Sequence, residues 1–395
     1  MSKLGEIFLI TSGGTPNRKK IEYYQNGTIP WVKTGDLKDK YVSKQIEYIT
    51  ELGLQNSSAK LFPSNTVLLA MYGATIGACS ILPFECATNQ ACAAFLPSKK
   101  VLPEYLYYFL LSHQEKFIRD GVGGAQPNIS AGYLKNVDFE LLSLEKQKQI
   151  AENLDKVTHL IDLCNQMLDK LDLLVKSRFI ELFGDPVLNS KKWEVKRLQD
   201  ITNKIGSGAT PKGGRESYGT EGISLIRSMN VYNGYFEHKE LAHISDEQAK
   251  KLDNVIVQKN DVLLNITGAS VARCCLVPSV VLPARVNQHV CIIRCESEVL
   301  PLFVCSVLTD GNYQKHLWKI AGSGATREAI TKQQVENLEI ILPPLELQTQ
   351  FSEFVQTVDK SKLAVKQLLE KAETLKKSLM QEYFSPQKGA FPHES

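Results

Sequence analysis

The chain has 395 residues, of which 43% are hydrophobic and 23% are charged. This length and hydrophobic content predict a globular protein with two or three separately cored domains. The formal net charge of +3 is only mildly basic, so composition neither requires nor excludes a nucleic-acid partner. The nine cysteines, an odd number that includes the adjacent pair Cys274 and Cys275, disfavour a disulfide framework and suit a reducing cytosol.

The start of the chain predicts no signal peptide, because residues 2–6 include an acidic side chain and the apolar run that follows is short. We therefore expect a cytoplasmic protein. One uncharged stretch, 61–84, has the length of a membrane span, but proline and glycine interrupt it, and its counterpart in the second half contains Asn265 and Arg273. We interpret both stretches as paired buried strands without membrane contact.

In the first half of the chain, short apolar runs alternate with glycine, proline and asparagine, which predicts strands, loops and a few short helices. The strand candidates are 7–11, 29–32, 66–71, 92–96 and 137–141. Apolar and aromatic residues fall at helical spacing in 103–118, and again in the corresponding stretch 301–317. These elements predict a mixed α and β domain of roughly 140 residues, which is a typical domain size.

A different pattern begins at Ile150, where apolar residues recur at alternating spacings of four and three. This heptad pattern predicts a long helix that packs along its length against another helix. Gly184, Asp185 and Pro186 then supply a helix stop. The seam residues are Ile150, Leu154, Val157, Ile161, Cys164, Leu168, Leu171 and Val175.

The second half of the chain repeats the first. Residues 4–183 match residues 198–384 in order, at offsets that grow from about 194 to 201 residues. Asn89-Gln90, for example, matches Asn287-Gln288. A period this long fits duplicated domains and is too long for a solenoid. We therefore expect a second domain similar to the first, followed by a second long helix.

The second long helix follows Pro343 and Pro344, because proline suits the first turn of a helix. Its seam is weaker than the first, because Lys362 and Lys376 occupy two seam positions and three leucines lie beside the seam. The apolar seam residues are Phe351, Val355, Val358, Val365, Leu369 and Ala372.

Chain direction predicts how the two long helices pair. The first helix leaves the first domain and ends where the second domain begins, so a second helix that packs on it must run back. The pair is then antiparallel, and each helix spans about 50 Å at 1.5 Å per residue. We expect the two domains to be held apart and related by an approximate two-fold axis. The alternative, in which both helices merely cover one common core, stays open.

These elements predict an α+β fold with a pseudo-two-fold internal repeat. It comprises a domain at 1–142, a long spacer helix within 143–184, a second domain at 185–342, a second spacer helix within 343–384 and a flexible tail at 385–395.

We find no catalytic motif in the sequence. The glycine-rich run 206–212 lacks the Gly-Lys-Ser/Thr ending of a phosphate-binding loop, and there is no His-Glu-x-x-His motif for zinc. The Asn/Asp-Pro-Pro-aromatic motif of amino-methyltransferases is also missing. Cys291 and Cys295 have no second ligand pair nearby and fit a buried core, while His238 and His243 fit a solvated pair. An acid-base set assembled only by the fold stays open.

Polar, basic and aromatic loops recur at matching places in the two halves. Lys and Arg neutralise phosphates or bind guanine edges, Asn and Gln bind adenine, and Gly lets a backbone come close. A solvated surface is the alternative for any single loop. Matched loops on two domains suit DNA, whose grooves repeat along an axis.

The candidate DNA-binding residues come from these loops. Those in the first half are Thr15, Asn17, Arg18, Lys19, Lys20, Tyr23, Lys33, Thr34, Thr75, Asn89, Gln90, Gln126 and Asn128. Those in the second half are Thr210, Lys212, Arg215, Tyr218, Arg227, Ser228, Asn230, Ser270, Asn287, Gln288, Thr326 and Arg327.

In the order, duplication and placement of its motifs, essentially the whole chain resembles the specificity subunit of a type I restriction-modification system. The supporting motifs in the first half are Gly13-Gly14-Thr15-Pro16, the run 29–37, Asn65-Thr66-Val67-Leu68, Gly73-Ala74-Thr75-Ile76-Gly77 and Asn89-Gln90. The two helix openings are Leu144-Glu145-Lys146-Gln147 and Leu345-Glu346-Leu347-Gln348. The second copy departs from the first at 223–227, where Ile223-Ser224-Leu225-Ile226-Arg227 replaces the tryptophan form of the first copy.

The resemblance implies a non-catalytic subunit with two target recognition domains, separated by a long antiparallel two-helix coiled coil. Each domain would read one part of a split sequence in double-stranded DNA. It also implies partners, namely two methyltransferase subunits that bind S-adenosylmethionine and endonuclease/translocase subunits that cleave unmodified DNA. We expect no metal and no cofactor in this chain itself. The main alternative is a non-catalytic two-domain protein scaffold that reads no DNA, and a stand-alone enzyme is a more distant one.

Overall fold

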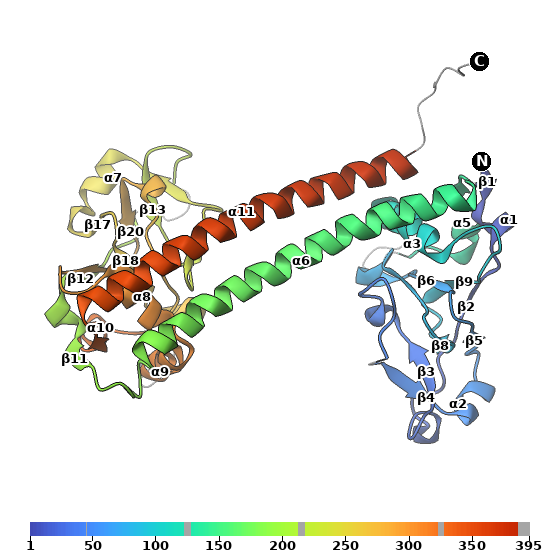
Figure 1. Ribbon diagram of the computed structural model, residues 1–395, viewed down its shortest axis with the longest axis horizontal. Helices are drawn as coiled ribbons and strands as arrows, with labels where there is room; N and C mark the ends of the chain where they lie inside the picture. Colours follow the sequence, from blue (N-terminus) through green and yellow to red (C-terminus); the bar gives the residue numbers. More distant parts are fainter. Residues whose placement is uncertain (45, 122–127, 212–217, 323–327, 386–395) are drawn as a thin grey trace, which may run out of the picture. The chain divides into compact units, whose positions relative to one another are not determined.

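The computed structural model describes residues 1–44, 46–121, 128–211, 218–322 and 328–385. The chain divides into two compact units, Met1–Asn165 with Gln367–Ser395, and Gln166–Lys366. Each unit holds one globular α+β domain together with half of helix α6 (Leu144–Phe183) and half of helix α11 (Leu345–Phe384). Both helices run unbroken for 40 residues (Figure 1).

The first domain is built on two four-stranded sheets. Their strands are β2 (Ile10–Ser12), β3 (Ile29–Val32), β4 (Glu47–Ile49), β5 (Leu61–Phe62), β6 (Val67–Ala70), β7 (Cys79–Ile81), β8 (Cys86–Thr88) and β9 (Cys92–Phe95). One sheet is antiparallel, in the order β2-β9-β6-β7. The other has the order β4-β3-β8-β5, and in it β3 and β8 run parallel.

Alternating side chains on β6 explain how the first domain is layered. Val67 and Leu69 pack in one cluster with Tyr105 and Leu106 of helix α3 (Pro103–Ser112), whereas Leu68 packs in another cluster with residues of the β3–β8 sheet. This period of two is the ordinary pleat of a strand, and all four residues of β6 are buried. The β2-β9-β6-β7 sheet therefore lies between the helices and the second sheet.

Short elements complete the first domain. They are β1 (Ser2–Lys3), α1 (Leu4–Ile7), η1 (Ile21–Tyr23), η2 (Thr34–Asp36), α2 (Glu51–Gln55), η3 (Gly73–Thr75), α4 (Gln114–Asp120), α5 (Ala131–Lys135) and β10 (Asp138–Phe139). Strand β1 pairs with β10, so the start of the domain is tied to its end.

The second domain repeats this plan. Its sheet strands are β12 (Thr202–Ser207), β13 (Ile223–Ile226), β16 (Ala242–Ile244), β17 (Ile256–Val257), β18 (Val262–Asn265), β19 (Cys274–Leu276), β20 (Ala284–Val286) and β21 (Val290–Cys295). The sheet orders are β12-β21-β18-β19 and β16-β13-β20-β17, and β13 runs parallel to β20. The expectation of two similar α+β domains is confirmed.

The remaining elements of the second domain largely follow the first, and a hairpin of β14 with β15 and the turns η7 and η9 are added. They are β11 (Glu194–Arg197), η4 (Leu198–Ile201), η6 (Ser228–Asn230), β14 (Val231–Tyr232), β15 (Tyr235–Phe236), α7 (Asp246–Lys250), η7 (Asp253–Val255), η8 (Gly268–Ser270), η9 (Ser279–Val281), α8 (Pro301–Thr309), α9 (Gly311–Gly322), α10 (Lys332–Glu336) and β22 (Glu339–Leu342).

Some element boundaries differ from the sequence expectations. The strand expected at 7–11 is wrong in its first half, because Glu6 accepts a hydrogen bond from the Lys3 amide (3.0 Å) and caps α1, so the strand starts only at Ile10. The strand expected at 137–141 shrinks to β10. The continuous helices expected at 103–118 and 301–317 are both broken.

The two helix breaks have local causes. At His113 the backbone leaves helical geometry, with φ −98° and ψ 3°, and α4 begins a new helix. In the second domain the Asp310 carboxylate accepts from the amides of Asn312 (2.8 Å) and Tyr313 (3.1 Å). An aspartate that caps the next helix in this way ends the previous one.

In the unit that holds the first domain, the start of α6 packs against the end of α11. Ile150 and Leu154 lie in the core of this domain with Phe384, and Asn153 Nδ2 donates to Tyr383 Oη at 3.3 Å. Nearby on α11, burial lowers the pKa of Lys376, while Asp162 and Asp155 of α6 oppose that change. Residue numbers rise along one helix as they fall along the other, so these halves are antiparallel.

In the unit that holds the second domain, the end of α6 packs against the start of α11. Lys362 Nζ lies 2.6 Å from Asp172 of α6, and the Arg178 guanidinium lies over the Phe354 ring at 5.8 Å. These halves are antiparallel too. In both units the seam positions, including the two lysines, are buried or half-buried, whereas Leu363, Leu368 and Leu375 beside the seam are exposed. Aspartates on α6 thus accommodate the seam lysines.

A buried glutamine ties each domain to the long helix that follows it. The Gln147 amide oxygen accepts from Leu102 N (2.9 Å), and its nitrogen donates to Lys100 O (2.9 Å) and Leu142 O (2.8 Å). Gln348 repeats this pattern with Leu300 N (2.8 Å), Glu298 O (3.4 Å) and Pro343 O (2.8 Å). Both glutamines are completely buried.

Among the described residues, no helix combines the length and apolar character that crossing a bilayer requires.

The hydrogen bonds of these buried glutamines, which we call the glutamine clamp, yield a stability prediction. Gln348→Leu should lower the free energy of unfolding by about 3 kcal/mol, because it leaves a buried amide and two carbonyls without their partner. Gln350→Leu, the same change at an exposed position two residues away, is the matched control. Urea denaturation followed by circular dichroism measures both. Equal effects of the two substitutions would contradict the clamp.

Candidate nucleic-acid interface

The parallel strands of each domain bring two polar loops to one sheet edge. Lys33 follows β3 directly and Asn89 follows β8, and the Asn89 amide donates to Val32 O at 3.0 Å. In the second domain Arg227 follows β13 and Asn287 follows β20, with Asn287 N donating to Ile226 O at 3.1 Å. Parallel strands end on the same side, so the loops that follow them lie together.

A glycine loop joins the same edge. Gly14 N donates to Thr88 O at 2.9 Å, and Thr15 Oγ1 donates to the amide oxygen of Gln90. A Cβ added at Gly13 would lie 1.8 Å from Thr88 O, so only glycine allows this approach.

The second domain repeats the glycine loop. Gly208 N donates to Asn287 O at 3.1 Å, Thr210 Oγ1 donates to Gln288, and a Cβ on Gly208 would lie 1.8 Å from Val286 O.

A short helical turn is the fourth loop. Met71 N donates to Ala91 O at 2.8 Å, which holds η3 beside the Asn89-Gln90 loop, and Ile266 N donates to His289 O at 3.0 Å in the second domain. Gly73 and Gly268 start these turns with φ +67° and +74°. We call the assembled loops the four-loop edge; it comprises 13–20, 33–36, 73–75 and 89–91 in the first domain, and 208–211, 227–230, 268–270 and 287–289 in the second.

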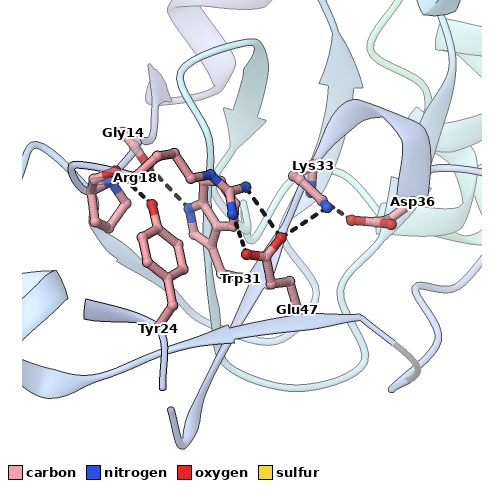
Figure 2. A network of polar contacts seen from close by, with 8 residues as sticks. Gly14, Arg18, Tyr24, Trp31, Lys33, Asp36 and Glu47 are labelled. Atoms are coloured by element: carbon pink, nitrogen blue, oxygen red, sulfur yellow. Dashed lines mark hydrogen bonds and ion pairs between the residues drawn. The ribbon is translucent and has the colours of Figure 1, made fainter. Parts of the chain in front are cut away.

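At the four-loop edge of the first domain an arginine lies close to two aromatic rings. The Arg18 guanidinium lies 4.6 Å from the ring centre of Tyr24 and 4.8 Å from that of Trp31. Both rings are anchored to the glycine loop, because Trp31 Nε1 donates to Gly14 O (3.0 Å) and Tyr24 Oη donates to Pro16 O (2.5 Å) (Figure 2).

Glu47 connects two cations of this edge, Arg18 and Lys33. Its carboxylate accepts from both terminal nitrogens of Arg18, one of them at 3.1 Å, and from Lys33 Nζ at 2.9 Å (Figure 2). Burial alone would raise the pKa of Glu47, but the hydrogen bonds from Arg18 and Lys33 outweigh it and lower that pKa. The hydrogen bond to Glu47 likewise raises the pKa of Arg18. Arg18 and Glu47 therefore both stay charged at neutral pH.

The corresponding edge of the second domain has different chemistry. The Arg227 guanidinium lies 5.5 Å from the ring centre of Tyr218 and donates to the Glu240 carbonyl. Its Nε is buried and has no hydrogen-bond partner among the described residues. Over the described parts of the chain, no carboxylate forms an ion pair with Arg227.

The candidate residues differ in how far they reach the surface. The exposed ones are Asn17, Arg18, Lys19, Lys20, Gln90, Asn128, Thr210 and Gln288. The half-buried ones are Thr15, Lys33, Thr34, Thr75, Asn89, Tyr218, Arg227, Ser228 and Ser270. The buried ones are Tyr23, Asn230 and Asn287. Gln126, Lys212, Arg215, Thr326 and Arg327 lie outside the described residues, as does the expected tail after Ser385.

The three buried candidates have internal roles. Asn230 accepts from Arg227 N (3.1 Å) and donates to Glu237 O (3.0 Å), which closes the turn η6. Asn287 accepts from His289 N at 3.0 Å. The Tyr23 ring is covered, and its hydroxyl accepts from Lys20 Nζ at 3.0 Å. These side chains shape the loops.

Two residues of these edges, Glu47 and His289, were not expected from the sequence, whereas Tyr24 stands in the basic and aromatic loop and Trp31 in the motif 29–37. Glu47 reaches the site because β4 pairs with β3 in a register that places it opposite Trp31. The loop between these two strands does not fix that register, so the sequence carried no signal for it. His289 directly follows the recognised Asn287-Gln288 pair, and this adjacency was the available signal.

The described residues contain no cluster of three or more His, Cys, Asp or Glu side chains placed to hold a metal ion. Burial raises the pKa of Cys291 and of Cys295 to about 12, so both thiols stay neutral, as core residues do. A cavity of about 610 Å³ opens beside Arg18, Tyr24 and Glu47. The four-loop edges therefore offer charged, amide and aromatic groups for binding.

Comparison with known proteins identifies the family. The type I restriction modification DNA specificity domain matches twice, over residues 1–173 and 190–374. The MjaIX specificity subunit of Methanocaldococcus jannaschii is 28% identical over 391 residues, covering 90% of this chain and 85% of that protein. The StySPI specificity subunit of Salmonella potsdam is 22% identical over 383 residues, covering 91% and 79%.

Two solved structures share the fold. The S subunit of a type I restriction-modification system from M. genitalium aligns with a TM-score of 0.59 at 15% identity, over 98% of this chain and 96% of that one. A structure described in a study of complex assembly and conformational transition of the type I R-M system aligns with a TM-score of 0.61 at 17% identity, over 97% and 96%.

Specificity subunits are non-catalytic, and the alternative of a protein scaffold without DNA reading finds no support in these comparisons. The chain belongs to the family of type I restriction-modification specificity subunits, and it carries two DNA specificity domains.

Proposed function

We propose that each domain reads one half of a split DNA target with its four-loop edge. One observation carries this proposal: four corresponding loops occur twice in one chain with different side chains, and two of the backbone hydrogen bonds that join them, Asn89 to Val32 and Met71 to Ala91, recur at equivalent positions in the second domain. Two similar frames with different side chains suit two half-sites of different sequence.

In the first domain we assign Arg18 to a base and Lys33 to a phosphate. The planar guanidinium is held between Glu47 and two rings, and such a fork matches the O6 and N7 acceptors of guanine. An ammonium group is a compact charge and suits a phosphate oxygen. In the second domain we assign the reading role to Arg227, because it directly follows β13 at the four-loop edge and its guanidinium lies over the Tyr218 ring.

The two arginines yield a binding prediction. Arg18→Ala should weaken selection by about 1–3 kcal/mol at one position of the first half-site, and Arg227→Ala should do so only in the second half-site. Lys19→Ala, at an exposed neighbour, should lower affinity on all sequences alike if it has any effect. Selection of bound duplexes from a random-sequence library measures each preference. Equal losses on every sequence for both arginine variants would mark phosphate contacts and contradict the assignment.

Glu47 yields a second binding prediction. Glu47→Gln should remove the charge that holds Arg18 and Lys33, so selectivity at the Arg18 position should fall while affinity for random DNA rises. The slope of log affinity against log salt should steepen by about one to two, as two cations become free for phosphates. An unchanged slope and an unchanged preference would show that Glu47 does not control these cations.

We further propose the division into recognition domains at 1–142 and 185–342, with α6 and α11 as spacers that set the gap between half-sites. Its support is that each 40-residue helix belongs to both compact units. The border between the units also falls at equivalent repeat positions, Asn165 and Lys366.

The spacer proposal predicts the effect of lengthening both helices. Seven residues inserted after Gln166 and seven after Gln367 preserve the heptad register and add about 10 Å to each helix. The unread gap should grow by about three base pairs at 3.4 Å per step, while the bases of both half-sites stay the same. Altered half-site bases with an unaltered gap would contradict the spacer role.

Specificity subunits of type I systems bind DNA and function with restriction and modification subunits. For this chain we propose two methyltransferase subunits, which would bind S-adenosylmethionine, and endonuclease/translocase subunits. We place the complex in the cytoplasm, since its DNA substrate is there and the cysteine content suits a reducing compartment.

A further inference from the structure

The second domain contains a linear chain of polar side chains at its four-loop edge. Thr267 Oγ1 lies 2.5 Å from His289 Nδ1, and His289 Nε2 lies 3.1 Å from Gln288 Nε2. The Gln288 amide oxygen in turn accepts from Thr210 Oγ1. The middle of this chain is the exposed glutamine of the Asn287-Gln288 loop.

The chemistry of these groups sets the direction of the hydrogen bonds. An amide nitrogen only donates, so His289 Nε2 accepts from Gln288, and the imidazole proton is on Nδ1. Nδ1 then donates to the Thr267 hydroxyl, which can accept. At the other end the Thr210 hydroxyl donates to the amide oxygen of Gln288. Every group therefore acts in a role that its chemistry allows.

The first domain contains only half of this arrangement. Thr15 Oγ1 donates to Gln90 as Thr210 does to Gln288. Ala91 stands at the place of His289, because the carbonyl of each accepts a hydrogen bond from the amide of the residue that follows the strand, Met71 in the first domain and Ile266 in the second. A hydroxyl accepts as readily as it donates, so Thr15 alone does not determine which way the Gln90 amide faces.

The orientation of the Gln288 amide decides what it offers to DNA. With one hydrogen engaged by His289 and one oxygen lone pair engaged by Thr210, the amide keeps one free N–H and one free lone pair. This donor–acceptor pair matches the N7 acceptor and the N6 amino group of adenine. Rotating the amide exchanges donor and acceptor, and with His289 in place this would require the imidazole proton to move to Nε2 at the same time.

We propose that His289 is a positioning residue that fixes the Gln288 amide, so that the second domain selects adenine at one position of its half-site. The proposal rests on the proposed reading of DNA by the four-loop edges. Residue 289 sets base selectivity through its neighbour and does not itself contact the base. The first domain, with Ala91, lacks this device.

The test uses the full-length chain copurified with its modification subunit and a random-sequence duplex library. His289→Ala should lower the preference for adenine about tenfold at one position of the second half-site and leave the first half-site unchanged. Gln288→Ala should remove the preference at that same position. His289→Gln, which can again accept from the amide, should restore most of it. His238→Ala, at an exposed histidine of the same domain, is the control.

The outcomes separate this inference from the proposed function. A uniform loss at all positions for His289→Ala, or no change at any position, would overturn the positioning role while the split target remains. A wild-type complex that selects no split sequence would instead overturn the proposed function itself. A loss of adenine preference in His289→Ala that is largely absent in His289→Gln supports the positioning role. A purely structural histidine would alter affinity and not the identity of one base.

Discussion

The parallel pairing of two strands in each domain is the constraint on which the rest of the structure depends. Because β3 runs parallel to β8, and β13 to β20, the loops that follow them leave the sheet at one edge. Gly13 and Gly208 then let a third loop approach this edge at a distance that any Cβ would prevent. One strand arrangement thus gathers residues that are far apart in sequence, and the gene duplication supplies it twice.

On this shared frame the two domains carry different chemistry. The first holds a set in which Glu47 connects Arg18 and Lys33 by ion pairs, and the second holds a chain of hydroxyl, imidazole and amide groups around Gln288 together with Arg227, which has no ion pair among the described residues. Partly exposed ion pairs such as Arg18–Glu47 contribute only about 0.2–1 kcal/mol to stability. DNA can therefore replace the carboxylate at small cost, so Glu47 serves to orient the cations. Different side chains on equal frames explain how one subunit can read two unlike half-sites.

The sequence predicted the duplicated α+β domains and the paired long helices, because a heptad seam and an ordered repeat are properties of the chain itself. It did not predict the breaks at His113 and Asp310, which depend on local backbone geometry and a capping carboxylate. The contact of Glu47 with Arg18 and Lys33 could not be predicted from the sequence, because the pairing register of β3 and β4 cannot be derived from the intervening loop. The burial of Asn230 could not be predicted from the sequence either. The same residue types occur in a loop whether their side chains shape the loop or project from it.

In our proposal one chain presents two similar reading edges to one DNA duplex. The decisive experiment is methylome sequencing of a host with and without this gene, in the presence of its methyltransferase partner. We expect a split adenine-methylated motif of two short unlike parts, which disappears when the gene is deleted. A continuous motif, or a split motif that persists after the deletion, would contradict it.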